Sequence, residues 1–343
     1  LQRKQGEIDL GEAIEQLEAL RFAWRGGAFE FSLLHQLGRF YLDEKKYVRG
    51  LAALKQLITY FDGEERKQKI VQEMTNVFTT LYLEGEADKM PLVKALALYN
   101  SFRELTPVGN NGDRMIEKLT DRLVDADLLE RAATLLDYQV EYRLSGKDKM
   151  RVATRLALVQ LLNHKPERAL KALRESATQP VSEDLARQRL HLTVRGLAEV
   201  GKTGQALQLL SEDISYEADL LRIDIYQRTQ DWSQAVEIFP RLLGDPAPDA
   251  ELEAQDLKFI LSWAVALSLG DDMEGLKDLH TRFGKRMEES PYASMFRVIS
   301  PEAERAGEDF LDLASKIADV DNFQAFMTDY RQQLKEKGLS ALN

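Results

Sequence analysis

The sequence predicts an all-α fold, an α-solenoid of about eight stacked helix–turn–helix repeats, and three observations support this prediction. The first is a short apolar pattern that recurs along the chain at a nearly constant spacing. The second is another amphipathic segment upstream of most copies of the pattern, separated from it by a short polar turn. The third is the composition, because only 9 Pro and 20 Gly in 343 residues favour short loops.

The recurring pattern consists of a small residue, an apolar residue directly after it, and a larger apolar residue four positions after the small one. Offsets of one and four place the three side chains on one face of a helix, where the small residue lets a neighbouring helix approach closely. We call the small residue the anchor. The anchors are Ala13, Gly50, Ala95, Ala132, Ala169, Ala206, Ala235 and Gly275. They are 37, 45, 37, 37, 37, 29 and 40 residues apart, which indicates an internal repeat.

The segment upstream of most anchors predicts a first helix, so each repeat is interpreted as helix A, a tight turn and helix B. Helix B carries the anchor. The two unequal intervals mark irregular places. The 45-residue interval contains a long turn at 85–91, and the 29-residue interval predicts a shortened helix A at about 217–229.

Two stretches resemble the tetratricopeptide repeat family in residue type and spacing. Leu34-x-x-Leu37-Gly38-x-x-Tyr41, followed by Gly50 and Leu54, is similar to the family signature, and 231–240 is similar to the second helix of that repeat. The resemblance covers about residues 10 to 285. The sequence departs from the family in its period, which is mostly 37 rather than 34, and in usually lacking the final Pro. The resemblance implies a right-handed superhelix whose concave face, lined mainly by A helices, binds a peptide or a partner helix.

The pattern changes near residue 291, so we expect a repeat array over 1–290 and a C-terminal helical cap, continuous with it, over 291–343. Ser300-Pro301 is a favourable helix start, with Ser as N-cap and Pro at the first helical position. A second helix is expected from Asp321. An end pair with a wettable outer face suits the terminus of a repeat array.

Composition narrows the classes of partner and chemistry. The net charge of −11 disfavours nucleic acid, and the absence of Cys excludes disulfides and thiolate metal sites. The four histidines have no helical metal-pair spacing, so no metal and no cofactor are expected. No apolar run is long enough for direct membrane insertion. The chain starts at Leu1 rather than Met, so we expect a piece of a larger bacterial protein, with cytoplasm and periplasm equally compatible.

One stretch, 196–203, fits the phosphate-binding pattern G-x-x-x-x-G-K-[ST]. A phosphate-binding loop follows a buried strand, whereas the residues before Gly201 belong to an amphipathic helix A. The stretch from Gly201 to Gly204 falls where the turn of the repeat belongs, and Ala206 arrives at the expected interval. We therefore interpret 196–203 as the end of a helix and its turn, and nucleotide binding as the disfavoured reading.

The sequence predicts a protein–protein interaction scaffold and no enzyme. The alternative is a non-catalytic α-superhelical arm of a longer enzyme, and self-association remains open in either case. Position on helix A marks Ser32, His35 and Arg39, and also Arg195 and Glu199, as candidate partner-binding residues. Trp24 and Arg25 join them because aromatic residues and Arg are enriched at interfaces. Trp232, at the start of a helix B, is expected in the core.

Overall fold

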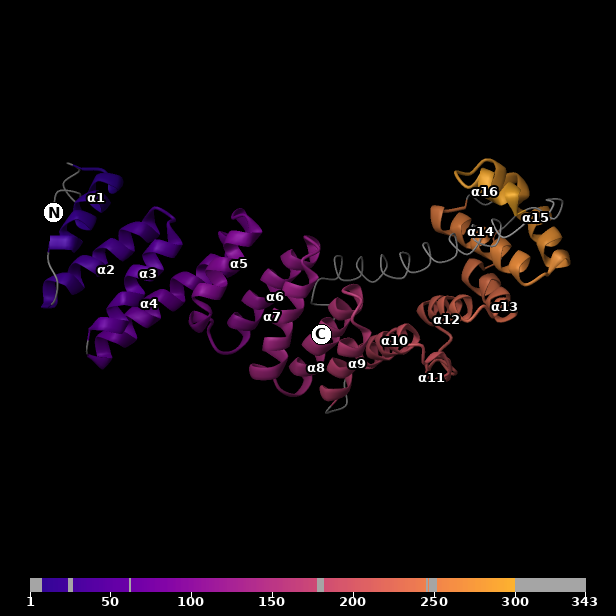
Figure 1. Ribbon diagram of the computed structural model, residues 1–343, viewed down its shortest axis with the longest axis horizontal. Coiled ribbons are helices and arrows are strands. Elements are labelled where there is room, and N and C mark those ends of the chain that lie inside the picture. The colour runs from indigo at the N-terminus through magenta and orange to yellow at the C-terminus, as the bar shows by residue number, and fades with distance from the viewer. Residues whose placement is uncertain are drawn as a thin grey trace. The chain divides into compact units, whose positions relative to one another are not determined.

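The computed structural model describes residues 8–23, 27–61, 63–177, 182–244, 246 and 252–299, and every regular element in these ranges is helical (Figure 1). This confirms the prediction of an all-α fold. The chain divides into two compact units, an N-terminal unit up to Leu144 and a C-terminal unit from Ser145. Among the described helices, none has both the length and the hydropathy required to cross a bilayer.

The N-terminal unit contains seven α-helices and two short 3₁₀ helices within the described residues. In chain order they are α1 (Leu10–Ala23), α2 (Gly27–Asp43), α3 (Tyr47–Tyr60), α4 (Glu64–Leu83), η1 (Ala87–Lys89), α5 (Leu92–Ser101), η2 (Arg103–Leu105), α6 (Asn110–Asp125) and α7 (Leu129–Tyr142). Helices α1, α2 and α3 each pack on the next helix in sequence, α4 packs on α6, and α6 also packs on α5 and α7.

The described part of the C-terminal unit contains nine α-helices. They are α8 (Gly146–Leu162), α9 (Pro166–Glu175), α10 (Glu183–Glu199), α11 (Thr203–Leu209), α12 (Tyr216–Arg228), α13 (Trp232–Leu243), α14 (Ala254–Leu269), α15 (Met273–Glu288) and α16 (Ala293–Val298). Successive helices pack on one another, and α10 also packs on both α8 and α12. Helix A of one expected repeat therefore contacts helix A of the next.

The anchors of the sequence pattern all lie near the beginning of a helix. Seven of them, Ala13 to Ala235, are the fourth residue of α1, α3, α5, α7, α9, α11 and α13, and all seven are buried. Gly275 is the third residue of α15. The pattern therefore marks every second helix, which is the placement expected for helix B.

Six turns that lead into these helices share one geometry. The residue two positions before the helix is in the left-handed region, with φ between 54° and 77°, in Lys45, Asp127, His164, Gly201, Gln230 and Asp271. The next amide in each turn donates to the carbonyl five residues earlier at 2.8–2.9 Å, as from Lys46 to Tyr41 and from Lys202 to Leu197. This is the hydrogen bond of a Schellman motif, which satisfies a free carbonyl at a helix C-terminus. One local structure thus closes six helices.

Helices α2 and α3 approach each other closely through glycine. A Cβ atom added to Gly38 lies 2.9 Å from Leu54 Cγ, and one added to Gly50 lies 2.7 Å from Leu42 Cγ. Both positions therefore require the absence of a side chain. The prediction that small residues permit close helix packing is confirmed at this contact.

The two irregular intervals appear in the structure as expected. The long turn at 85–91 contains η1, and α12, the helix A of the 29-residue interval, has only 13 residues compared with 17 in α10. Helix α12 begins at Tyr216, next to the expected position. The shorter anchor interval therefore corresponds to a shorter helix A.

The described part of the C-terminal unit ends in an apolar core formed by α14, α15 and α16. Phe296 and Ile299 are buried in it beside Phe283. Trp232 packs against a neighbouring cluster that includes Phe239, which confirms its expected place at the core. The helices expected from Ser300 onward lie outside the described residues.

Candidate functional site

The first group of predicted partner-binding residues lies on one side of α2, close to α4. His35 Nε2 is 2.8 Å from Glu73 Oε2, and Arg39 Nε is 3.7 Å from Glu73 Oε1. The side chain of His35 is 31% exposed and that of Arg39 is 61% exposed. Ser32 is exposed, and its hydroxyl donates to the carbonyl of Ala28. The structure thus brings two of the three side chains together on one carboxylate and leaves them accessible.

Aromatic and cationic side chains surround this group. The Phe31 ring lies 6.3 Å from the His35 ring and makes an edge contact with Phe61. The guanidinium of Arg66 lies 5.8 Å from the centre of the Phe31 ring, within the range of a cation–π contact. The accessible surface between α2 and α4 therefore combines a carboxylate, two cations and an aromatic ring.

The second predicted group is placed differently. Arg195 is 2% exposed, and its Nε donates to Glu199 Oε1 at 2.8 Å while its Nη1 donates to Asp224 Oδ2 at 2.6 Å. Asp224 also accepts from Arg228 Nε at 2.9 Å. The prediction of Arg195 as an outward groove residue is wrong, because its guanidinium is buried in a charge network between α10 and α12. Trp24 and Arg25 lie outside the described residues.

A further contact of α10 involves two residues that were not predicted to bind a partner. His191 is buried, and its Nε2 lies 2.8 Å from Asp213 Oδ2, in the loop between α11 and α12. Burial acts to raise the pKa of the Asp213 carboxyl, but hydrogen bonds from the Ser215 hydroxyl and amide and from the His191 ring outweigh it and lower the pKa to about 2. Asp213 is therefore charged at neutral pH.

The α11–α12 loop is held from its other side by Arg222. Its Nη2 donates to the backbone carbonyls of Leu210 and Asp213, and its Nη1 donates to the buried Asp219 at 2.6 Å. Arg241 on α13 donates to both oxygens of the same carboxylate at 2.9 Å. Charge-assisted hydrogen bonds of this kind are among the stronger ones, so the loop has a defined conformation.

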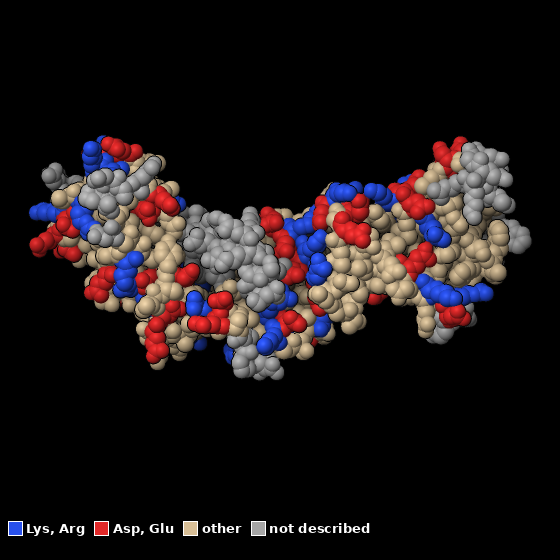
Figure 2. Space-filling model, turned by 180° about the vertical axis from the view of Figure 1, so that it is seen from behind, with Lys and Arg blue, Asp and Glu red and all other residues tan. Residues whose placement is uncertain are grey.

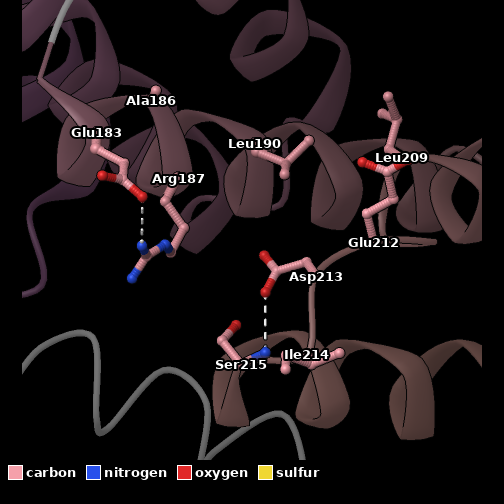
Figure 3. A pocket seen from close by; sticks show the side chains of 9 residues that line it. All are labelled: Glu183, Ala186, Arg187, Leu190, Leu209, Glu212, Asp213, Ile214 and Ser215. Carbon is pink, nitrogen blue, oxygen red and sulfur yellow. Dashed lines mark hydrogen bonds and ion pairs between the residues drawn. The ribbon is translucent and has the colours of Figure 1, made fainter.

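This loop and α10 line an open groove with a volume of about 600 Å³ (Figure 3). Its apolar lining comes from Ala186, Leu190, Leu209 and Ile214. Its polar lining comes from Glu183, Arg187, Glu212, Asp213 and Ser215. The residues 183, 186, 187 and 190 recur at helical spacing, so they form one side of the groove from α10, while the loop forms the other. The groove is the candidate binding site of the C-terminal unit.

The polar lining of the groove is predominantly acidic. Three carboxylates face one guanidinium, and Arg187 Nη2 pairs with Glu183 at 3.4 Å. Elsewhere, acidic and basic side chains are interspersed on the face shown in Figure 2. The acidic lining of the groove has the same sign as the net charge of −11 of the whole chain.

The stretch 196–203 forms the end of α10, a turn and the start of α11. Its amides already donate within the helix terminus: Val200 to the carbonyl of Gly196, Gly201 to Ala198 and Lys202 to Leu197. A phosphate-binding loop instead directs such amides at the ligand. Gly196 lies inside α10, where an added Cβ atom would be 2.9 Å from Leu170 Cγ. These contacts agree with the interpretation of the stretch as a helix end and turn.

No group of three or more His, Asp and Glu side chains in the described part of the chain is arranged to hold a metal ion. No protein-family model matches the sequence, and a search of curated proteins finds no significant match.

Proposed function

We propose that the chain is a tetratricopeptide-like α-solenoid that serves as a protein-binding scaffold, with a peptide or a helix of a partner lying along its A helices. The observation that carries the proposal is the single turn geometry that closes six helices, each followed by a helix with a small residue near its start. Repeated helix pairs stack with a small constant rotation and leave an extended surface.

The surfaces of the A helices supply the side chains that binding requires. His35 and Arg39 on α2 are accessible beside Glu73, and α10 forms one side of the open groove. Aromatic residues and Arg contribute most to the binding energy of many interfaces. The proposed role of the chain is therefore recognition by side chains on helix A, without chemistry of its own.

The architectural part of the proposal is tested by small-angle X-ray scattering. A compact globular chain of this length has a radius of gyration of about 20 Å. An α-solenoid is elongated, so we expect a clearly larger radius of gyration for the monodisperse protein. A value near 20 Å would contradict the solenoid.

The functional part is tested by affinity capture from the native extract, with the whole chain as bait and mass spectrometry as readout. We expect one reproducible protein in a near-stoichiometric amount, competed away by untagged chain. Arg39→Glu on α2 should reduce the capture. Lys171→Glu, an equally drastic change at an exposed position on α9, a helix B, should not. Folded bait that captures nothing would contradict the scaffold.

A further inference from the structure

We propose that the groove between α10 and the α11–α12 loop binds an extended peptide segment in which an apolar side chain is flanked by Lys or Arg. This inference rests on the proposed scaffold function and specifies the chemistry of the partner at one site. It is carried by the shape of the groove, by the exposed apolar side chains of its wall and by its acidic lining.

The apolar part of the argument concerns Ile214. Ile214 is 92% exposed, and Leu209, which also lines the groove, is exposed as well. Together with Ala186 and Leu190 they form one apolar lining, and contact with a partner would remove this apolar area from water. An apolar side chain of the peptide is therefore expected against Ile214, Leu209 and Leu190.

The loop that carries Ile214 has a defined conformation in the free chain. The carboxylate of Asp213 accepts from the Ser215 amide at 2.9 Å (Figure 3). The same carboxylate contacts His191, and the carbonyl of Asp213 accepts from Arg222. Both neighbours of Ile214 are thus fixed by hydrogen bonds. A preorganised loop loses little conformational entropy on binding, which favours affinity.

The charges of the groove select a cationic partner. Glu212 is exposed, Asp213 is charged at neutral pH, and Glu183 pairs with Arg187, so three carboxylates and one guanidinium line the groove. An acidic groove attracts Lys and Arg side chains and disfavours acidic peptides. Its volume of about 600 Å³ lies within the range of ligand clefts and accommodates a few side chains.

The test is selection of a random dodecapeptide library displayed on phage against the whole chain. We expect enrichment of peptides with Leu, Ile, Met or Phe next to Lys or Arg. Fluorescence anisotropy then measures the affinity of an enriched peptide, which we expect to fall as the salt concentration rises. Enrichment of acidic peptides, or no enrichment at all, would overturn the proposal.

A matched pair of double variants locates the binding. Ile214→Ser with Glu212→Lys changes the groove, and Val108→Ser with Glu288→Lys makes the same two changes at exposed positions elsewhere. We expect the groove variant to bind the selected peptide about tenfold more weakly or worse, since loss of an interface anchor has effects of this size. The control variant should bind like the unaltered chain. Equal binding by both variants would refute the assignment to the groove.

Circular dichroism melting of both variants shows that they are folded. Capture from the native extract with the same baits then separates two failures. If the unaltered chain and the groove variant capture the same protein and no peptide is selected, the groove inference fails and the scaffold stands. If every folded bait captures nothing, the scaffold fails. Analytical ultracentrifugation tests a further occupant. If the unaltered chain forms a dimer and the groove variant does not, the occupant is a second copy of the chain and the basic-peptide proposal is overturned.

Discussion

Two repeats of the chain carry the same His–Arg pair at the same positions, and the structure uses the two pairs differently. His35 and Arg39 lie 15 and 11 residues before the anchor of α3, and His191 and Arg195 lie 15 and 11 residues before the anchor of α11. The first Arg is 61% exposed, whereas the second is 2% exposed. Equivalent repeat positions therefore produce an accessible surface in one unit and a buried network in the other.

The difference follows the segment that comes after each repeat. The anchor interval after α3 is 45 residues, and the next helix A, α4, is 20 residues long; the interval after α11 is 29 residues, and α12 has 13. The short interval places Asp213 against His191 and Asp224 against Arg195. In the first pair, Glu73 contacts both side chains. In these two repeats, the Arg is accessible where the following repeat is long and buried between two helices where the following repeat is short.

The largest effect is expected for Arg195→Met. This change leaves the carboxylates of Asp224 and Glu199, which are mostly buried, without their shared cation, so we expect the C-terminal unit to lose about 3 kcal/mol of unfolding free energy. Urea unfolding followed by tryptophan fluorescence measures this, because Trp232 and Trp263 lie in that unit.

Arg39→Met is the control at the equivalent position. Its ion pair with Glu73 is exposed and long, so we expect a change below about 0.5 kcal/mol, measured by urea unfolding followed by circular dichroism. Similar losses for Arg195→Met and Arg39→Met would contradict the distinction between the buried and the exposed pair.

The second expected effect concerns the carboxylate that contacts His191. The pKa of Asp213 is about 2 in the folded chain, below its usual value of 3.8, so ionisation of Asp213 stabilises the fold. This stabilisation, roughly 2 kcal/mol, is complete above about pH 4 and disappears as the pH falls toward 2. We therefore expect Asp213→Asn to destabilise the C-terminal unit at pH 7 and to converge with the unaltered chain in acid.

Glu73→Gln provides the comparison for Asp213→Asn in the other His pair. Because the His35–Glu73 contact is about one-third exposed, we expect a loss below about 1 kcal/mol at pH 7. The measurement is urea unfolding at a series of pH values. A loss for Asp213→Asn that stays constant down to pH 2 would show that its ionisation does not contribute.

The positions of the helices were predictable because the small residues at the helix contacts recur at one place in each repeat. Anchors such as Ala169 sit where a neighbouring helix must approach, so their spacing located helix B throughout the described chain. The short α12 was predictable for the same reason. The burial of Arg195 was not predictable, because it depends on where α12, the next helix A, places Asp224. Nor was the groove, whose loop at 210–215 lies between two repeats and carries no repeated pattern.

A smaller effect is expected at the turn between α10 and α11, where Gly201 has φ of 77°. An L-residue with a Cβ atom is strained in this region, so Gly201→Ala should lower the unfolding free energy by about 1 kcal/mol. Gly204→Ala is the control, since Gly204 lies inside α11 and nothing lies within 4 Å of an added Cβ atom. It should be neutral or stabilising in the same urea measurement, and a loss equal to that of Gly201→Ala would argue against turn strain.

The smallest expected effect comes from the reverse change, to glycine, in the turn between α2 and α3. Lys45 occupies the position equivalent to Gly201 with φ of 59°, and its ion pair with Glu86 is exposed. Lys45→Gly removes the strain of the left-handed backbone, while the greater freedom of glycine in the unfolded chain offsets part of the gain. We expect a net stabilisation of about 0.5 kcal/mol, seen as slower hydrogen exchange of amides at the end of α2 and the start of α3. Lys46→Gly, one residue further along the same turn, tests whether the gain comes from φ at position 45, since Lys46 has φ of −82° and should lose stability when changed.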